Sequence, residues 1–423
     1  MYYFQQFRAI LSTNPATRMK ILQDGGFVRR AFFAGRISRS LTAALVTMAM
    51  CATLWAQAPD RAQSPIDAEG GFLANQGAQP RFESGTKISG QAEVALRAQR
   101  VLSIPHFTGS FAFNGQTFPF NVVGTQPQAG GITRIPTQLK PVTLLFEGYE
   151  DDQGEPIVLS PEPVVLSVRN SPNFRSAQYQ TGFTQFADAV QRAQFYNAMA
   201  QDWHTLLDLP QLLRPLIMVV PKNSAKVFRN RSTGAVYAVV DTAFFVSQLN
   251  TLVQMENLRV DALPIILTHN VMLAPDADVG RCCVLGFHTA FDAGQVRNTQ
   301  MVQTLVWASW IDQGILGSGI ADVTAMSHEI SEWFNDPFGT NLVPAWQYPT
   351  ASLGCQNNLE TGDPLATMPN AGYPVTIDGV TYHPQNEVLL PWFTRQPSDA
   401  LDHAYSFPDA TLVTAPSQAC PAH

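Results

Sequence analysis

The sequence predicts an α+β fold in which a mixed sheet carries a metal-binding helix and is preceded by a β-rich N-terminal part. Three observations lead to this class. Aromatic and β-branched residues cluster between residues 96 and 175, as is typical of strands. Short apolar runs separated by turn residues continue to residue 288. The stretch 327–337 then spaces its apolar side chains helically and contains His328, Glu329 and Glu332.

Composition limits the classes of partner. The chain has 423 residues, 45% of them hydrophobic and only 14% charged. Residues 1–56 contain seven Lys or Arg and one acidic residue, so the other residues contain 19 basic and 32 acidic ones, a net charge of −13. An acidic body without a basic cluster argues against binding of nucleic acid or of anionic membranes.

The N-terminal segment predicts export. Four arginines precede an apolar run at residues 41–56 that is too short for a comfortable membrane span: Arg29, Arg30, Arg36 and Arg39. We therefore interpret residues 1–56 as a signal peptide, with the product secreted or periplasmic and no membrane anchor after cleavage. The Arg29-Arg30 pair also fits a twin-arginine signal, with ordinary secretion as the default.

Export determines how the cysteines are interpreted. Four remain after the signal peptide: Cys282, Cys283, Cys355 and Cys420. Four cysteines allow three pairings, between which the sequence alone does not choose. A bond between Cys355 and Cys420 would tie the C-terminal tail to the loop after the metal helix. Cys282 and Cys283 would then form a vicinal pair, oxidised or free.

The elements follow in order along the chain. Residues 57–95 are rich in Gln, Ala, Gly and Pro and predict a flexible leader. Within the β-rich part, residues 96–175, Asn114-Gly115 separates two aromatic runs and predicts a hairpin. Further strands are expected at 142–146 and 164–168.

The remainder, residues 176–423, predicts a second α+β unit with a loop-rich C-terminal region. A helical period covers 184–199, and strands are expected at 216–220, 235–240, 263–267 and 283–288. A helix is expected at 301–311 and a short hairpin at 377–381. Prolines and glycines punctuate the chain after Pro337.

The helix at 327–337 carries the candidate chemistry. His328 and Glu332 are four residues apart, so they lie on one face, and both can coordinate Zn²⁺ or another divalent cation. Glu329 can act as general base on a water molecule. The metalloprotease motif is H-E-x-x-H, so Glu332 departs from it. The alternative is an amphipathic helix with His and Glu on a solvated face. We expect the helix to begin at Ser318 and to end before Pro337.

A third ligand is needed for catalysis. The candidates are Asp336, Glu360, Asp363 and His383. Asp336 precedes Pro337 and more simply caps the helix end. The other histidines lie near apolar residues and are interpreted as hydrogen-bonded structural side chains: His106, His204, His269, His288 and His403.

A family resemblance covers residues 325–365. This stretch resembles secreted zincin-like proteins of bacteria and fungi, and the plant exordium (phosphate-induced) proteins, which share H-E-x-x-E-x-x-x-D/N-P followed by an N-A-W element and an E-x-x-D element. Here these are His328-Glu329-x-x-Glu332, Asp336-Pro337, Ala345-Trp346 and Glu360-Thr361-Gly362-Asp363. The segment 282–288 also looks like these relatives. Pro344 stands where many relatives have Asn.

The resemblance implies roles for five residues. His328 and Glu332 would be metal ligands and Glu329 the base. Glu360 would be the third ligand, and Asp363 would orient or supplement it. The implied fold is a zincin-like mixed sheet with a metal-binding helix.

Two functions compete on this sequence. The first is an exported metal-dependent hydrolase, a peptidase that acts on polypeptide. The second is a non-catalytic exported binding protein with a structural cation. A third possibility is a metal-free helix with a structural His/Glu pair. A serine hydrolase of the G-x-S-x-G type is excluded because Leu316 stands where a glycine is needed.

Overall fold

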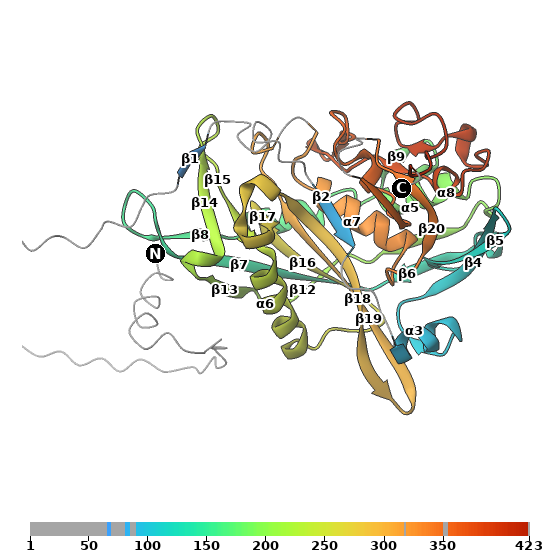
Figure 1. Ribbon diagram of the computed structural model, residues 1–423, viewed down its shortest axis with the longest axis horizontal. Helices are drawn as coiled ribbons and strands as arrows, with labels where there is room; N and C mark the ends of the chain where they lie inside the picture. Colours follow the sequence, from blue (N-terminus) through green and yellow to red (C-terminus); the bar gives the residue numbers. More distant parts are fainter. Residues whose placement is uncertain (1–65, 69–80, 85–89, 317–318, 350–353, 422–423) are drawn as a thin grey trace, which may run out of the picture. The chain divides into compact units, whose positions relative to one another are not determined.

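The computed structural model describes residues 66–68, 81–84, 90–316, 319–349 and 354–421 (Figure 1). The predicted signal peptide, residues 1–56, and Ser318 lie outside the described residues. Among the described helices, none is long and apolar enough to cross a membrane. The described residues form an α+β fold with a large mixed sheet and few helices.

One thirteen-stranded sheet is the frame of the fold. Its main path runs β1-β14-β15-β17-β18-β19-β16-β7-β12, and pairs are both parallel and antiparallel. Four shorter strands lie off this path and pair with β7, β18 or β19. In path order the nine strands are β1 (Ile66–Ala68), β14 (Ala225–Asn230), β15 (Val236–Asp241), β17 (Val271–Ala274), β18 (Val284–Val296), β19 (Thr299–Trp310), β16 (Leu263–His269), β7 (Thr137–Glu150) and β12 (Gln211–Leu212). The four off the path are β2 (Arg81–Ser84), β3 (Val101–Leu102), β8 (Pro156–Leu159) and β13 (Leu216–Val220).

The helix predicted at 301–311 was wrong, because this segment is strand β19. Val302 and Thr304 to Ala308 are buried, and β19 lies between β18 and β16 in the sheet. A central strand buried on both faces reads as a continuous apolar run, which periodicity alone does not distinguish from a buried helix. The strand predicted at 164–168 was also wrong, because helix α4 (Val165–Arg169) occupies most of it.

The other predicted strands and turns agree with the structure. β4 (His106–Phe113) and β5 (Gln116–Val123) form the expected hairpin, and Asn114 and Gly115 both have positive φ, as a two-residue hairpin turn requires. β22 (Val375–Ile377) and β23 (Val380–Tyr382) form the second one. The segment predicted as a flexible leader contributes β1, β2 and most of helix α3 (Gly90–Arg97). β7, from the predicted β-rich part, pairs with β16 within the same sheet.

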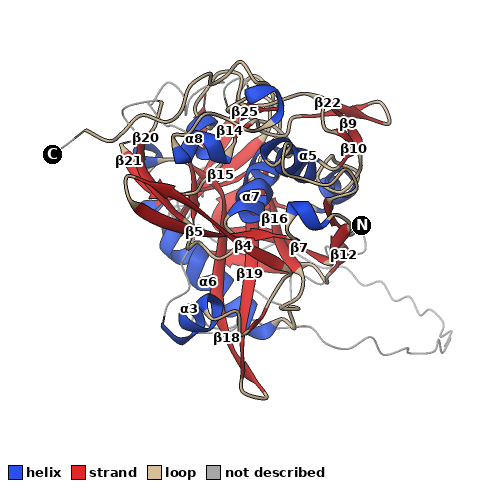
Figure 2. Ribbon diagram, turned by 90° about the vertical axis from the view of Figure 1, so that its right-hand side faces the viewer, coloured by secondary structure: helices blue, strands red, loops and turns tan. Residues whose placement is uncertain are grey.

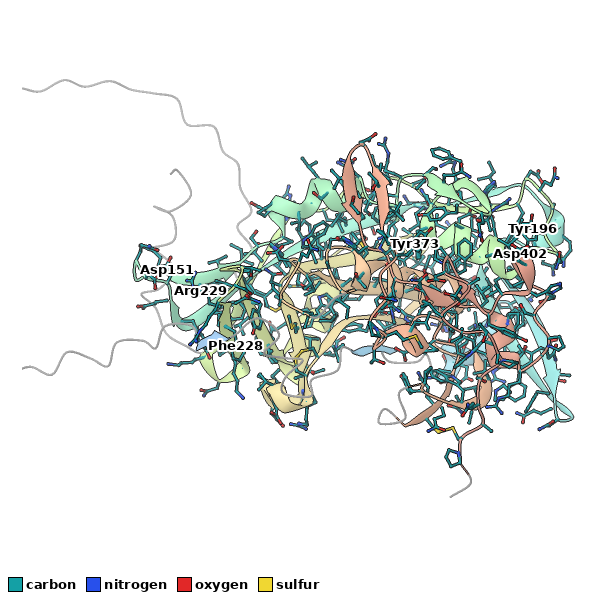
Figure 3. The ribbon with its side chains drawn as sticks, turned by 90° about the horizontal axis from the view of Figure 1, so that it is seen from above. Asp151, Tyr196, Phe228, Arg229, Tyr373 and Asp402 are labelled. Atoms are coloured by element: carbon teal, nitrogen blue, oxygen red, sulfur yellow. A yellow bond between two sulfur atoms is a disulfide. The ribbon has the colours of Figure 1, made fainter. Side chains whose placement is uncertain are left out.

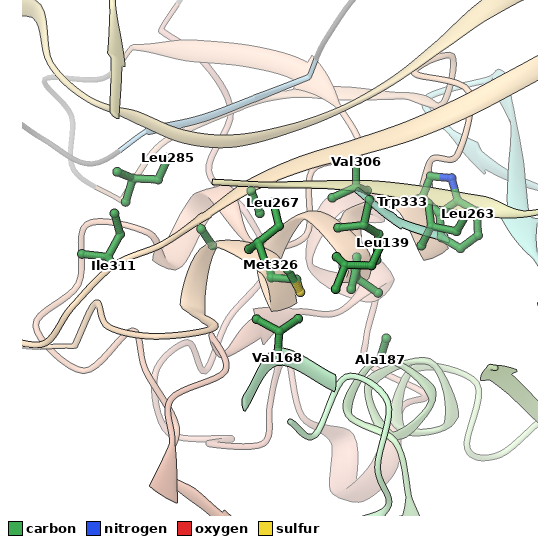
Figure 4. Packing of buried hydrophobic residues seen from close by; sticks show 14 of the residues in the cluster. Leu139, Val168, Ala187, Leu263, Leu267, Leu285, Val306, Ile311, Met326 and Trp333 are labelled. Atoms are coloured by element: carbon green, nitrogen blue, oxygen red, sulfur yellow. The ribbon is translucent and has the colours of Figure 1, made fainter. Parts of the chain in front are cut away.

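Two helices pack on opposite faces of the sheet. α7 (Thr324–Asn335) contacts β18 and β19, and Met326, Ile330 and Trp333 join the apolar cluster that also holds Val306 (Figures 2 and 4). α6 (Thr242–Met255) joins a second cluster that includes Trp307. Because consecutive residues of a strand point to opposite faces, these clusters lie on the two sides of β19.

Helix α7 is shorter at its start than expected. It begins at Thr324, so the predicted start at Ser318 was wrong. Asp322, just before the helix, accepts hydrogen bonds from the backbone N–H and the imidazole of His383. Its end is as expected, because Asn335 is the last helical residue and Pro337 follows Asp336.

Shorter elements and two disulfides complete the fold. One disulfide joins Cys355 to Cys420. The other joins the neighbours Cys282 and Cys283, and the peptide bond between these two residues is cis. Tyr373 packs against the apolar cluster between α5 and the C-terminal segments (Figure 3). The remaining elements are β6 (Ile132–Ile135), β9 (Ala177–Tyr179), β10 (Gly182–Thr184), α5 (Phe186–Gln194), β11 (His204–Leu207), β20 (Leu342–Gln347), β21 (Cys355–Asn358), β24 (Glu387–Val388), α8 (Leu390–Thr394) and β25 (Ser406–Phe407).

Candidate metal centre

Three separate parts of the chain bring imidazole and carboxyl groups into one buried cluster. Strand β18 supplies one residue, helix α7 three, and the loop of residues 359–363 two. All six side chains belong to residues that are at most 5% exposed. The buried cluster consists of His288, His328, Glu329, Glu332, Glu360 and Asp363.

The helix delivers the predicted pair. His328 Nε2 lies 3.0 Å from Glu332 Oε1, as expected for residues one turn apart on the same face. Every residue of α7 is buried. The alternative of a His/Glu pair on a solvated helix face was therefore wrong.

The loop after β21 brings Glu360 and Asp363 to the helix. The backbone N–H groups of Gly362 and Asp363 donate to Glu332 Oε1 at 3.1 and 3.2 Å. Glu360 Oε2 lies 3.7 Å from His288 Nε2, and the nearest carboxyl group to Glu360 is that of Glu332, so two acidic side chains face each other in a buried site. Buried carboxylates are costly unless a cation or a proton compensates their charge.

Neighbouring side chains fix this loop. Tyr348 Oη and Gln356 Nε2 donate to Asp363 Oδ2, each at 2.6 Å, while Asp363 Oδ1 lies 3.8 Å from His328 Nε2. Trp346, in the Ala-Trp element, is buried and donates from Nε1 to the Asn358 carbonyl at 2.9 Å. The Ala-Trp element therefore holds the strand from which the Glu360 loop leaves.

Two of the candidate third ligands serve other purposes. Asp336 accepts hydrogen bonds from the backbone of Thr340 and Asn341 at 2.9 and 3.1 Å, so it fixes the chain after the helix. His383 Nδ1 lies 2.6 Å from Asp322 Oδ2, before the start of α7. Neither belongs to the groups of side chains that can hold a metal ion in the described structure.

His288 is the site residue that sequence reasoning missed. Its Nδ1 lies 3.3 Å from Glu329 Oε2 and 3.6 Å from Glu332 Oε2, so it is a member of the cluster and not simply a structural histidine. Two signals pointed to it. It lies in the segment 282–288 that resembles the relatives. It also follows Gly286 by two residues, and residues two apart on a strand share a face.

Two glycines let these elements approach. A Cβ at Gly286 would lie 2.7 Å from Glu329 Cγ, so only glycine lets α7 lie this close to β18. A Cβ at Gly362 would lie 2.3 Å from His328 Nδ1. Glycine is therefore needed in the Glu-Thr-Gly-Asp element, because any side chain there would overlap the imidazole of His328.

Burial and mutual repulsion set the electrostatics of the cluster. Burial, with the neighbouring His328, lowers the pKa of His288 to about 3, and burial lowers that of His328 to about 4. Burial raises the pKa of Glu329, Glu332 and Glu360 well above the usual range, and the repulsion between these carboxylates adds to it. Within the described residues, no lysine or arginine is paired with these glutamates.

A divalent cation fits this set of donors. Two groups of side chains place one ligand atom each within 4.8 Å of one another: His288 with Glu332 and Glu360, and His328 with Glu329 and Glu332. Neutral imidazole and ionised carboxylate together suit Zn²⁺, Mn²⁺ or Fe²⁺. Low histidine pKa values keep the imidazoles neutral, which is the form that binds metal.

Comparison of the chain with protein-family models, with curated proteins and with solved structures finds no match. The functional inference therefore depends on the geometry of the cluster.

Proposed function

We propose that this protein is an exported, zincin-like, metal-dependent hydrolase that acts on polypeptide. The buried cluster supports this proposal, because two imidazoles and three carboxyl groups of buried residues offer ligand atoms within 4.8 Å of one another, in two groups that share Glu332. Without a cation, burying each ionised carboxylate would cost on the order of several kcal/mol, because the charge loses its hydration.

The residues of the cluster have distinct parts in this proposal. His328, Glu332 and Glu360 would hold the ion; the structure groups Glu332 with His328 on one side and with His288 and Glu360 on the other. Gly362 and Asp363 fix the carboxylate of Glu332 through their N–H groups. A bound divalent cation supplies Lewis acidity, which lowers the pKa of water and stabilises negative charge on a carbonyl oxygen. Glu329 takes the proton from the attacking water and passes it to the leaving amine.

Backbone pairing beside the cluster favours polypeptide as the substrate class. β2 pairs in parallel with β18, with Gly286 opposite Phe82 and His288 opposite Ser84. An extended backbone segment thus already pairs with the strand that carries His288. Strand addition of this kind recognises peptides through main-chain hydrogen bonds, whatever their sequence.

Export is supported by the cysteines. The two disulfides are typical of proteins that fold outside a reducing cytosol. The apolar run at residues 41–56 behind four arginines supplies the signal.

Hydrolysis of an unfolded polypeptide by the purified protein tests the proposal. We expect activity that chelator abolishes and Mn²⁺ or Zn²⁺ restores. In Glu329→Gln we expect a loss of at least about a hundredfold, the lower end of the usual effect of a general base. His383→Ala is the matched control, because His383 pairs with Asp322 outside the cluster. Full activity in Glu329→Gln contradicts the mechanism.

The second candidate, a structural cation in a non-catalytic binding protein, is favoured by one observation. Each residue of the cluster is at most 5% exposed, as expected of a closed site. This alternative predicts that chelator lowers the melting temperature while hydrolysis is never detected. The proposed hydrolase instead loses activity whenever the ion is removed.

A further inference from the structure

We propose that the cluster holds two divalent cations bridged by the carboxylate of Glu332. The inference deepens the proposed function, on which it depends for the binding of a cation to this cluster. It begins from the two groups of potential ligands. One is His288, Glu332 and Glu360 and the other is His328, Glu329 and Glu332, so Glu332 is the single residue common to both.

The two oxygens of Glu332 face different imidazoles. Oε1 lies 3.0 Å from His328 Nε2, and Oε2 lies 3.6 Å from His288 Nδ1. The two imidazoles come from different elements, helix α7 and strand β18. A carboxylate that presents one oxygen to each of two ligand groups has the arrangement of a bridging ligand, and two-metal sites place their ions about 3.5–4 Å apart.

Each half of the cluster has its own further carboxylate. On the β18 side, one ligand atom from each of His288, Glu332 and Glu360 lies within 4.8 Å of the others, although Glu332 faces Nδ1 and Glu360 faces Nε2 of the His288 ring. On the helix side, Asp363 directs Oδ1 to within 3.8 Å of His328 Nε2, while Tyr348 and Gln356 bind its other oxygen. One ion is thus assigned to His328 and Glu332 with Asp363, which takes the place of Glu329 as a ligand, and the other to His288, Glu332 and Glu360. Glu329, whose Oε2 lies 3.3 Å from His288 Nδ1, is left to act as the base.

Metal content of the full-length protein tests this inference without reference to activity. The protein is stripped with chelator, reloaded with Mn²⁺ and freed of excess ion; bound Mn²⁺ is then counted per chain and its electron paramagnetic resonance spectrum recorded. We expect two Mn²⁺ per chain and the spectrum of an exchange-coupled pair. One Mn²⁺ per chain with the spectrum of an isolated ion overturns the inference.

Variants assign the ions to their sides. Glu360→Gln keeps the size of the side chain, and we expect it to halve bound Mn²⁺ and to leave the spectrum of an isolated ion; His288→Asn is a second variant with the same expected result. His383→Ala should keep both ions. Two coupled ions retained in both Glu360→Gln and His288→Asn would refute the assignment. Hydrolysis with a single bound ion would overturn the two-ion inference and keep the proposed function. Two bound ions without hydrolysis would keep the two-ion inference and overturn the proposed function.

Discussion

Gly362→Ala would place a methyl group where the imidazole of His328 already lies. The added Cβ would be 2.3 Å from Nδ1 and 2.6 Å from Cε1 of that ring, whereas comfortable contacts between such atoms are about 3.5–4.0 Å. The ring or the loop must therefore move by about 1 Å or more. Gly362 has φ −87° and ψ −32°, which alanine adopts freely, so the whole effect is steric.

The expected magnitude follows from this overlap. Overpacking of a filled interior costs about 1–3 kcal/mol, so the free energy of unfolding should fall by that amount. Displacement of the imidazole, and of the N–H groups that fix Glu332, should weaken binding of a divalent cation about tenfold to a hundredfold. Urea unfolding and calorimetric titration with Mn²⁺ measure the two quantities.

Gly280→Ala is the matched control. Its added Cβ would meet only Asp278 Oδ1, at 3.4 Å, and Gly280 is exposed, whereas every residue of the cluster is buried. We expect this variant to bind Mn²⁺ like the unaltered protein. If Gly362→Ala behaved like Gly280→Ala in both measurements, the close approach of the loop to His328 would not be what positions the imidazole.

Two further predictions concern stability. The pKa of the cluster glutamates is raised in the folded protein, mainly by burial, and above about pH 6.5 the imidazoles are neutral whether folded or not. The metal-free protein should therefore lose stability as pH rises above that value, until the pH exceeds the pKa of the carboxyl groups in the folded protein. Bound Mn²⁺ should remove this loss. Equal urea midpoints at neutral and alkaline pH in the metal-free protein would contradict the prediction. Replacing Cys355 and Cys420 by serine opens a loop with a sequence separation of 65, and the free energy of unfolding should fall by about 4 kcal/mol. Urea unfolding measures this loss. A loss below about 1 kcal/mol would show that other contacts hold the loop.

The local parts of the fold are well predicted by the sequence. The helix with His328 and Glu332 and the hairpin at Asn114-Gly115 depend on spacing and turn chemistry within a few residues, so a single stretch carries the whole signal. The segment at 301–311 is different. Its helix-like apolar run is a strand because β16 and β18 pair with both of its edges, and that information lies elsewhere in the chain.

The site shows the same division. The ligands on α7 follow from an i, i+4 spacing, and Glu360 followed from a family resemblance, but His288 contributes from a strand 40 residues before His328. Its side chain reaches the cluster because Gly286 has no side chain, which lets Glu329 of α7 pack closely against β18. No periodicity within either segment reports that contact, since it depends on how the helix packs on the sheet.

The bond between Cys355 and Cys420 also sets an order of events during synthesis. Glu360 lies just after the first of these cysteines, so its loop is tethered only when a further 60 residues have left the ribosome. In a reducing compartment the tether does not form at all. The loop that carries Glu360 and Asp363 is therefore tethered by this disulfide only in an oxidising environment, long after β18 and α7 have been made.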